Sequence, residues 1–190
     1  PILIILVGMV SIYFSGVYHY LSIDYLRMYH TTLKKIVNMH PVAVPIAFCV
    51  VYIISIAFSV PGAFFLTLLG GYLFPQPFST IYVIFSATCG ATIIFLAART
   101  ALKDILKKKA GPFLQRMEKG FQENAVSYLL FLRFVPLFPF WLVNIAPAFF
   151  GVSLITFVWT TLVGIFPGSL VYTHAGGGLD KILENNEAFT

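Results

Sequence analysis

The sequence predicts an all-α integral membrane protein in which spanning helices are combined with re-entrant helical hairpins. Of its 190 residues, 59% are hydrophobic and only 10% are charged, whereas soluble domains carry about 25% charged residues. The long apolar stretches are interrupted by prolines and paired glycines, which end or bend helices. Irregular backbone is tolerated at membrane depth only where protein or a water-filled cavity surrounds it. These breaks therefore predict hairpins buried inside a membrane domain.

The first forty residues predict two different membrane elements. Residues 1–20 are apolar and long enough to cross about 30 Å of hydrocarbon as a helix. They lack the basic segment and small-residue cleavage site of a signal peptide, so we predict an N-terminal transmembrane helix. Residues 21–40 place charged and apolar side chains on opposite faces of a helix. This pattern is typical of an amphipathic linker that lies at the membrane surface.

The main membrane domain is predicted over residues 41–178, and its first half contains the first hairpin. Residues 42–98 carry no charge, and they are too many for one helix and somewhat many for two. The economical solution is a spanning helix at about 42–59, a hairpin at about 60–78 and a second spanning helix at about 79–98. The residues expected to shape this half are Pro61, Gly62, Gly70, Gly71 and Gly90.

The second half repeats this pattern. A basic loop over 99–123 holds seven of the twelve Lys and Arg residues, and an apolar hairpin is predicted at 124–147. A spanning helix follows at about 152–172, and residues 179–190 form a polar tail. If the hairpins enter from opposite sides, the halves form a pseudo inverted repeat, a design used by transporters; chance similarity of two apolar stretches is the alternative. The residues expected to break the helices here are Pro136, Pro139, Pro167 and Gly168.

The positive charges predict an orientation. If both hairpins return to the side they entered, segments 21–40 and 99–123 lie on the same side and together hold ten of the twelve Lys and Arg residues. The positive-inside rule then places both in the cytoplasm, below the inner (plasma) membrane of the cell. The basic side chains expected to meet anionic lipid at the membrane surface are Lys103, Lys107, Lys108, Lys109 and Arg116.

Arg133 is the strongest indication of a functional site. It is the only Lys, Arg, Asp or Glu between Asn124 and Leu179. A cation at membrane depth costs about 2.5–3.5 kcal/mol on insertion scales, so it is retained where it faces protein, water or a ligand. Because a guanidinium binds phosphate through paired hydrogen bonds, we predict a phosphate-headgroup contact. The alternative is a structural arginine that caps hairpin carbonyls or extends to the interface.

Two further polar residues are candidates for the same phosphate site. Asn144 either bonds free backbone in the second hairpin or contacts a ligand, and Arg99 either anchors a helix end or contributes to the site. The sequence has no HExxH, GxSxG, P-loop or CxxC motif, so we predict a non-enzyme with no catalytic residue, cofactor or metal. Because the basic residues form two clusters rather than a diffuse basic surface, we also predict no nucleic-acid binding.

The second half resembles the signature of the DedA superfamily, also called the SNARE-associated Golgi protein or VTT-domain family. The matching stretch is FLRFVPLFPFWLVNIAPAFFGVSLITFVWTTLVGIFPGSLVY, in which Arg133, Pro136, Pro139, Asn144, Pro167 and Gly168 carry the pattern. The first half is similar to the family's first hairpin and following helix, with matches at Gly70, Gly71, Gly90 and Arg99. The resemblance covers about residues 40–178 and is closest to the Tvp-type bacterial branch.

The resemblance implies two facing re-entrant hairpins and a role in lipid handling. We expect a transporter or scramblase that moves phospholipid or polyprenyl phosphate between leaflets; a proton- or ion-linked solute transporter and a non-transporting assembly factor are the alternatives. The expected partners are membrane lipids, and a homo-oligomer is compatible with the sequence. DedA-proper members carry acidic residues in the first hairpin region, but this chain has none between Val42 and Ala98. Proton coupling through a carboxylate there is therefore in doubt.

Overall fold

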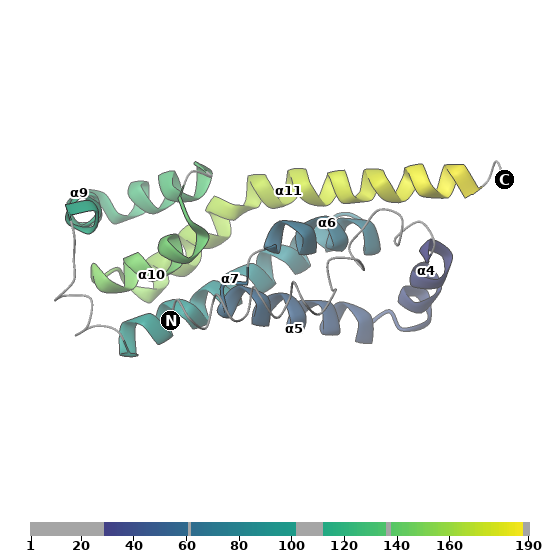
Figure 1. The fold of residues 1–190 in the computed structure, drawn as a ribbon, viewed down its shortest axis with the longest axis horizontal. Coiled ribbons are helices and arrows are strands. Elements are labelled where there is room, and N and C mark those ends of the chain that lie inside the picture. Colours follow the sequence, from purple (N-terminus) through teal and green to yellow (C-terminus); the bar gives the residue numbers. More distant parts are fainter. Residues whose placement is uncertain (1–28, 61, 102–111, 136–137, 188–190) are drawn as a thin grey trace.

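The computed structural model describes residues 29–60, 62–101, 112–135 and 138–187, and the regular secondary structure in these ranges is helical (Figure 1). The predicted N-terminal helix, residues 21–28 of the linker, Pro61, Pro136, Lys103 and Lys107 to Lys109 lie outside them, as does the side chain of Arg116. The helices are α4 (His30–Met39), α5 (Ala43–Ala57), α6 (Ala63–Leu73), α7 (Phe78–Ala101), α9 (Pro112–Phe134), α10 (Phe140–Phe149) and α11 (Leu154–Glu187).

Two of these helices, α7 and α11, are long and apolar enough to cross a membrane. They pack antiparallel, because the Oγ1 atoms of Thr80 and Thr173 lie 2.7 Å apart while Phe95 stacks on Phe157 with ring centroids 4.3 Å apart. Among the described residues, α4 and α5 reach a comparable apolar length only together, and they meet at 108°. The predicted all-α membrane fold is confirmed.

The first hairpin consists of α5 and α6. Their 15 and 11 residues give lengths of about 22 and 16 Å at 1.5 Å per residue, short of about 30 Å of hydrocarbon. The helices run antiparallel, since Phe48 packs on Phe74 (centroids 5.3 Å apart) and the Tyr52 hydroxyl lies 2.9 Å from Thr67 Oγ1. The chain reverses next to Gly62, whose φ of +115° suits glycine.

This hairpin begins earlier than the sequence predicts. The sequence predicts a spanning helix at about 42–59 and the hairpin at about 60–78, whereas α5 is itself the first arm and α6 the second. The physical reason is that a 15-residue hairpin arm and a membrane span share the same uninterrupted apolar composition. The reversal point near residue 60 agrees with the prediction, but the sequence does not reveal that the preceding helix is short.

The second hairpin is formed by the last part of α9 and by α10. Helix α9 is kinked at Asn124, where φ is −159° and ψ is 88°. The Asn124 Oδ1 accepts a hydrogen bond of 3.1 Å from the Ser127 backbone N–H, which is how an N-cap residue starts a new helix. The chain reverses before Pro139, the N-cap of α10. These limits agree with the hairpin predicted at 124–147.

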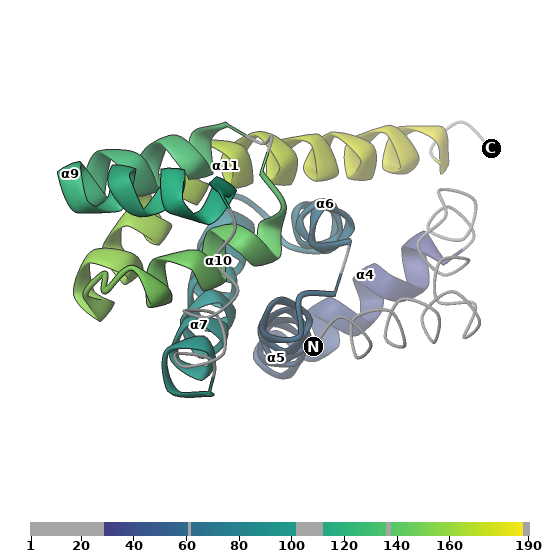
Figure 2. The same ribbon diagram turned by 60° about the vertical axis from the view of Figure 1, so that its left-hand side comes forward.

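The two hairpin–helix units are inverted relative to each other. In the first unit, α5 runs parallel to α7, with Phe48 and Val83 near each other at one end and Ile56 against Gly90 at the other. In the second unit, α9 runs alongside α11 in the same direction (Figure 1). Because α7 and α11 are antiparallel, one unit enters the fold from each end. Figure 2 shows α5 and α6 on one side of the molecule and α9 and α10 on the other.

Helix α11 is longer than predicted. It continues without a break from Leu154 to Glu187, through Pro167. The prediction that the Pro167-Gly168 pair ends a helix is therefore wrong, and residues 179–187 of the predicted polar tail extend α11 instead. Proline is tolerated inside membrane helices because neighbouring groups compensate for the missing backbone hydrogen bond.

The described parts of the two basic segments lie at opposite ends of the fold, whereas the sequence predicts that both segments face the same side. Helix α4 contacts the far end of α11, where Lys34 Nζ lies 2.6 Å from Asp180 Oδ2. Arg99 is in the last turn of α7, at the end of the fold where α11 begins (Figure 1). Since α5 and α6 return to their starting end, only α7 crosses the full length between the segments. The described parts of the two segments are therefore separated by the length of α7, and the side that faces the cytoplasm stays a prediction.

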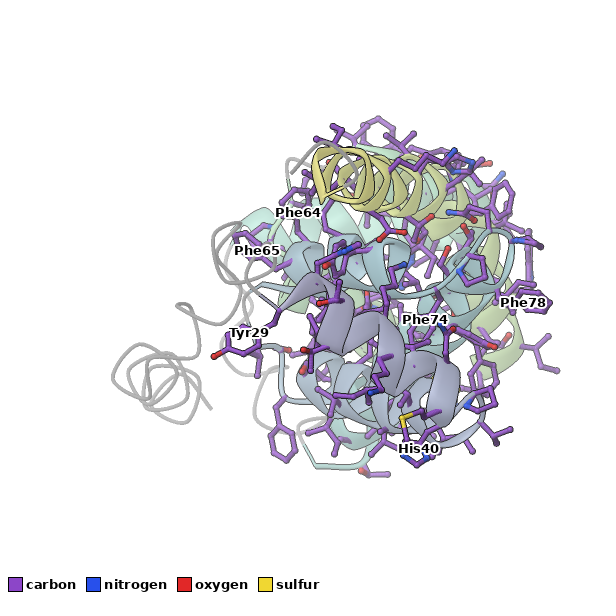
Figure 3. The ribbon with its side chains drawn as sticks, turned by 90° about the vertical axis from the view of Figure 1, so that its right-hand side faces the viewer. Tyr29, His40, Phe64, Phe65, Phe74 and Phe78 are labelled. Carbon is purple, nitrogen blue, oxygen red and sulfur yellow. The ribbon has the colours of Figure 1, made fainter. Side chains whose placement is uncertain are left out.

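The outer surface is rich in large apolar side chains. Ile155 is 79% exposed, and Phe64, Phe65 and Phe78 are each about half exposed. Figure 3 shows these three phenylalanines at the periphery, whereas Phe74 lies within the molecule. Soluble monomers rarely expose such large contiguous apolar surfaces, so this surface suits contact with lipid chains.

Candidate functional site

Arg133 lies at the end of α9 and is held by the two helices that follow it. Its Nη2 donates to Asn144 Oδ1 on α10 at 3.1 Å and to Thr161 Oγ1 on α11 at 2.7 Å. Its Cζ lies 5.3 Å from the ring centroid of Phe157 on α11, within the range of a cation–π interaction. The second hairpin and the second spanning helix thus meet at this guanidinium.

The surface of α11 is shaped to receive the arginine. A Cβ atom added to Gly164 would lie 2.8 Å from the Cβ and 3.0 Å from the Cδ of Arg133, so the close approach requires glycine. Phe157, Thr161 and Gly164 are spaced four and three residues apart, which places them on one face of α11. Sequence reasoning missed these three residues. Their helical spacing was the only available signal, and it does not show which helix they face.

The positive charge of Arg133 has no acidic partner among the described residues. In addition, Arg133 Nε and Asn144 Nδ2 are buried and form no hydrogen bond with protein. Buried donors in native proteins nearly always have an acceptor, and these two belong to side chains that already bond each other. The site therefore holds one positive charge without a counter-ion in the described chain, and a guanidinium of this kind suits an oxygen-rich anion such as phosphate.

Arg133 also lines a cavity of about 640 Å³. The walls come from both hairpins and from α11, and most of them are apolar. They include Ala63, Phe64 and Thr67 of α6, Phe134 and Phe140 around the second hairpin, and residues 164, 165, 167–169, 171 and 172 of α11. Pro167 has no N–H to donate to the Val163 carbonyl. A helix carbonyl without its usual hydrogen-bond donor therefore also lies beside this cavity. Apolar walls around a single cation would suit an amphiphile with an anionic group.

The structure brings together only part of the predicted site. Arg133 and Asn144 are bonded, and Pro167 and Gly168 line the same cavity. Arg99 is exposed at the end of α7 and forms no hydrogen bond or ion pair within the described chain. Among the described residues, no group of three or more His, Cys, Asp or Glu side chains could hold a metal ion.

The predicted glycines act at helix crossings. A Cβ on Gly71 would lie 2.0 Å from the Thr173 carbonyl oxygen, and one on Gly90 would lie 2.5 Å from Ile56 Cβ. A Cβ on Gly70 would lie 2.8 Å from the Phe48 ring. These glycines therefore permit the close packing of α5, α6, α7 and α11 that positions the hairpins.

Two inverted hairpin–helix units around an arginine in an apolar fold define an integral membrane protein of the paired-hairpin class. The VTT domain matches residues 60–177 of this chain, which is more than half of its length. The chain belongs to the VTT-domain family, a family of membrane proteins linked to membrane lipid handling.

Relatives with this domain occur in animals. The chain is 29% identical to the transmembrane protein 41 homolog of Drosophila melanogaster, over 86% of this chain and 52% of that protein. It is 32% identical to transmembrane protein 41B of Danio rerio (83% and 57%) and 31% identical to that of Homo sapiens (82% and 55%). The chain thus spans little more than half the length of these curated relatives. No solved structure matches it. The family resemblance is confirmed, and the Tvp-type branch stays a prediction.

Proposed function

We propose that this protein moves phosphate-bearing lipids, phospholipid or polyprenyl phosphate, between the two leaflets of a membrane without a catalytic step. The observation that carries the proposal is Arg133, a cation without an acidic partner in the described chain that lines a cavity with mostly apolar walls. The guanidinium would attract the phosphate through paired hydrogen bonds, while the acyl chains stay among the apolar walls.

The short hairpin arms support this route. Because α5, α6 and α10 are too short to span the hydrocarbon, their ends lie within the membrane, where the cavity between them would lower the barrier for a polar headgroup. None of the residues that line this cavity is acidic. That composition favours an anionic headgroup over a cation or a carboxylate-linked proton as the transported species.

We also propose an orientation and a location. With the basic segments at opposite ends, the positive-inside rule favours the end with more Lys and Arg. Segment 99–123 holds seven of the twelve, so this end would face the cytoplasm, with the protein in the plasma membrane of the cell.

The test is exchange of headgroup-labelled phospholipid and polyprenyl phosphate in proteoliposomes. Wild type would be compared with Arg133→Ala and with Arg133→Lys, which keeps the charge but loses the paired geometry. Arg99→Ala is the matched control, because it removes an exposed arginine outside the cavity. Rapid exchange that is lost in folded Arg133→Ala and retained in Arg99→Ala is the expected result. Absence of exchange by wild type with both lipids would overturn the proposal.

A further inference from the structure

A second polar basin lies at the end of the fold where α4 meets α11. It consists of two adjoining cavities, of about 790 and 370 Å³, that share Lys34 and Asp180 in their walls. The larger cavity lies along α4, and the smaller one extends to the turn between α6 and α7. Figure 3 looks onto this end, with α4 in front and Phe74, which lines the smaller cavity, behind it.

The walls of this basin are positively charged. They contain three lysines, Lys34, Lys35 and Lys181, and a single carboxylate, that of Asp180. Asp180 is already engaged, because its Oδ2 lies 2.6 Å from Lys34 Nζ and its Oδ1 lies 3.0 Å from His30 Nε2. Lys35 and Lys181 have no acidic partner in the described part of the chain. Within the described chain, two lysine charges therefore remain for an anion.

Lys34 is also fixed in position. Besides Asp180, its Nζ donates to the Tyr72 backbone carbonyl at 2.9 Å and lies 5.6 Å from the Tyr72 ring centroid. A lysine held by backbone at the wall of a cavity loses less freedom on binding than a freely rotating one, which favours affinity.

The glycines of α11 supply an independent observation. Gly176 is explained by packing, because its Cβ would lie 2.1 Å from the Leu68 carbonyl oxygen. Gly178 lines the basin, and a Cβ there would have nothing within 4 Å. Glycine weakens the interior of a helix, and packing does not require it at this position. Because Gly178 has no side chain, the volume of the basin stays open at this position.

We propose that this basin, defined by Lys34, Lys35, Lys181 and Gly178, binds a phosphate group, carried either by a lipid headgroup or by a free phosphate. The location suits a headgroup, because α4 meets α5 at 108°, as a helix that turns along the membrane surface would. The proposal goes beyond lipid movement through the Arg133 cavity. Residues 164–172 of α11 line that cavity and residues 174–181 line this basin, so the two can be tested separately.

The test is calorimetric titration of the full chain in detergent with dihexanoyl phosphatidic acid, inorganic phosphate and dihexanoylglycerol, which lacks phosphate. Lys181→Gln should weaken phosphatidic acid binding about fivefold, the factor for one lysine at an anionic membrane surface. Gly178→Leu should weaken it at least as much by filling the basin, without lowering the unfolding temperature. The matched control Arg99→Gln, at the other end of the fold, should bind as wild type does. Because Arg133 would also bind a phosphate headgroup, each variant is also titrated in the Arg133→Ala background, where the same differences should remain.

The three probes identify the source of the phosphate. Binding of phosphatidic acid alone identifies a lipid headgroup, and competition by inorganic phosphate identifies the phosphate group itself as the recognised part. Equal affinity of wild type, Lys181→Gln and Gly178→Leu for phosphatidic acid would overturn the proposal, as would equally tight binding of dihexanoylglycerol. Because the basin variants are also compared in the Arg133→Ala background, failure here is distinguishable from failure of lipid exchange.

Discussion

Replacing Gly164 with alanine tests whether Arg133 packs against α11 as described. The added methyl group would lie 2.8 Å from Arg133 Cβ and 3.0 Å from its Cδ, closer than carbon atoms approach in folded proteins. The nearest atoms belong to the base of the arginine side chain, so a simple rotation of its far end does not relieve the overlap. We expect the guanidinium to move away from Thr161 and Asn144.

The magnitude follows from two opposing effects. Overpacking of a buried site costs about 1–3 kcal/mol, and exchange of glycine for alanine inside a helix returns about 1 kcal/mol. The net change for Gly164→Ala is therefore about 0–2 kcal/mol of destabilisation. Gly168, one turn further along α11, has nothing within 4 Å of an added Cβ. Gly168→Ala should show only the helix gain, a stabilisation of up to about 1 kcal/mol.

The assay is thermal unfolding of the two variants in detergent, followed by tryptophan fluorescence. For a chain of this size, 1 kcal/mol corresponds to about 2–4 °C, so Gly164→Ala should unfold several degrees below Gly168→Ala. Lipid exchange by Gly164→Ala should also fall. If the two variants are stabilised equally and Gly164→Ala exchanges lipid at the wild-type rate, Arg133 does not lie against this face of α11.

Two further predictions concern the polar contacts at either end of α11. Thr161→Val removes the acceptor that lies 2.7 Å from the guanidinium at nearly constant volume, and should lower the free energy of unfolding by about 1–3 kcal/mol. Thermal unfolding measures this loss. Thr161→Ser keeps the hydroxyl and should lose far less stability. Asp180→Asn removes the ion pair with Lys34, so backbone amides of α4 should exchange faster with deuterium while those of α7 stay as protected as in wild type. Unchanged exchange in α4 would show that Asp180 does not hold this helix.

The sequence predicts the second hairpin well because polar and proline residues mark its limits. Asn124 caps a helix start, and Pro139 is followed directly by α10. The first hairpin has no such mark at its beginning. Residues 42–57 are uncharged and mostly apolar, and the packing of α5 on α6, through Phe48 on Phe74 and Tyr52 on Thr67, shows that α5 is an arm and not a span. The expectation that both basic segments share one side depends on the same assignment, because reading α5 as a span changes the number of crossings.

The candidate site also has one part that the sequence predicts and one part that it does not. Arg133 and Asn144 are predictable because they are isolated polar residues in one apolar segment, where burial requires a partner. Phe157, Thr161 and Gly164 lie more than twenty positions from Arg133 in the chain and are ordinary residues for a membrane helix. Their role depends on how α9 packs on α11, and the sequence contains no local pattern that specifies this contact.

The crossing of α6 and α11 sets the thickness of the wall between the Arg133 cavity and the lysine basin. At this crossing, Gly71 lies against the Thr173 backbone and Gly176 against the Leu68 carbonyl, so the two main chains touch without side chains between them. Thr67 and Tyr172 line the cavity on one side, whereas Gly71 and His174 line the basin on the other. The backbone contact between α6 and α11 therefore separates the two polar regions. Any residue larger than glycine at Gly71 or Gly176 would push the two helices apart and open a path between the cavity and the basin along this contact.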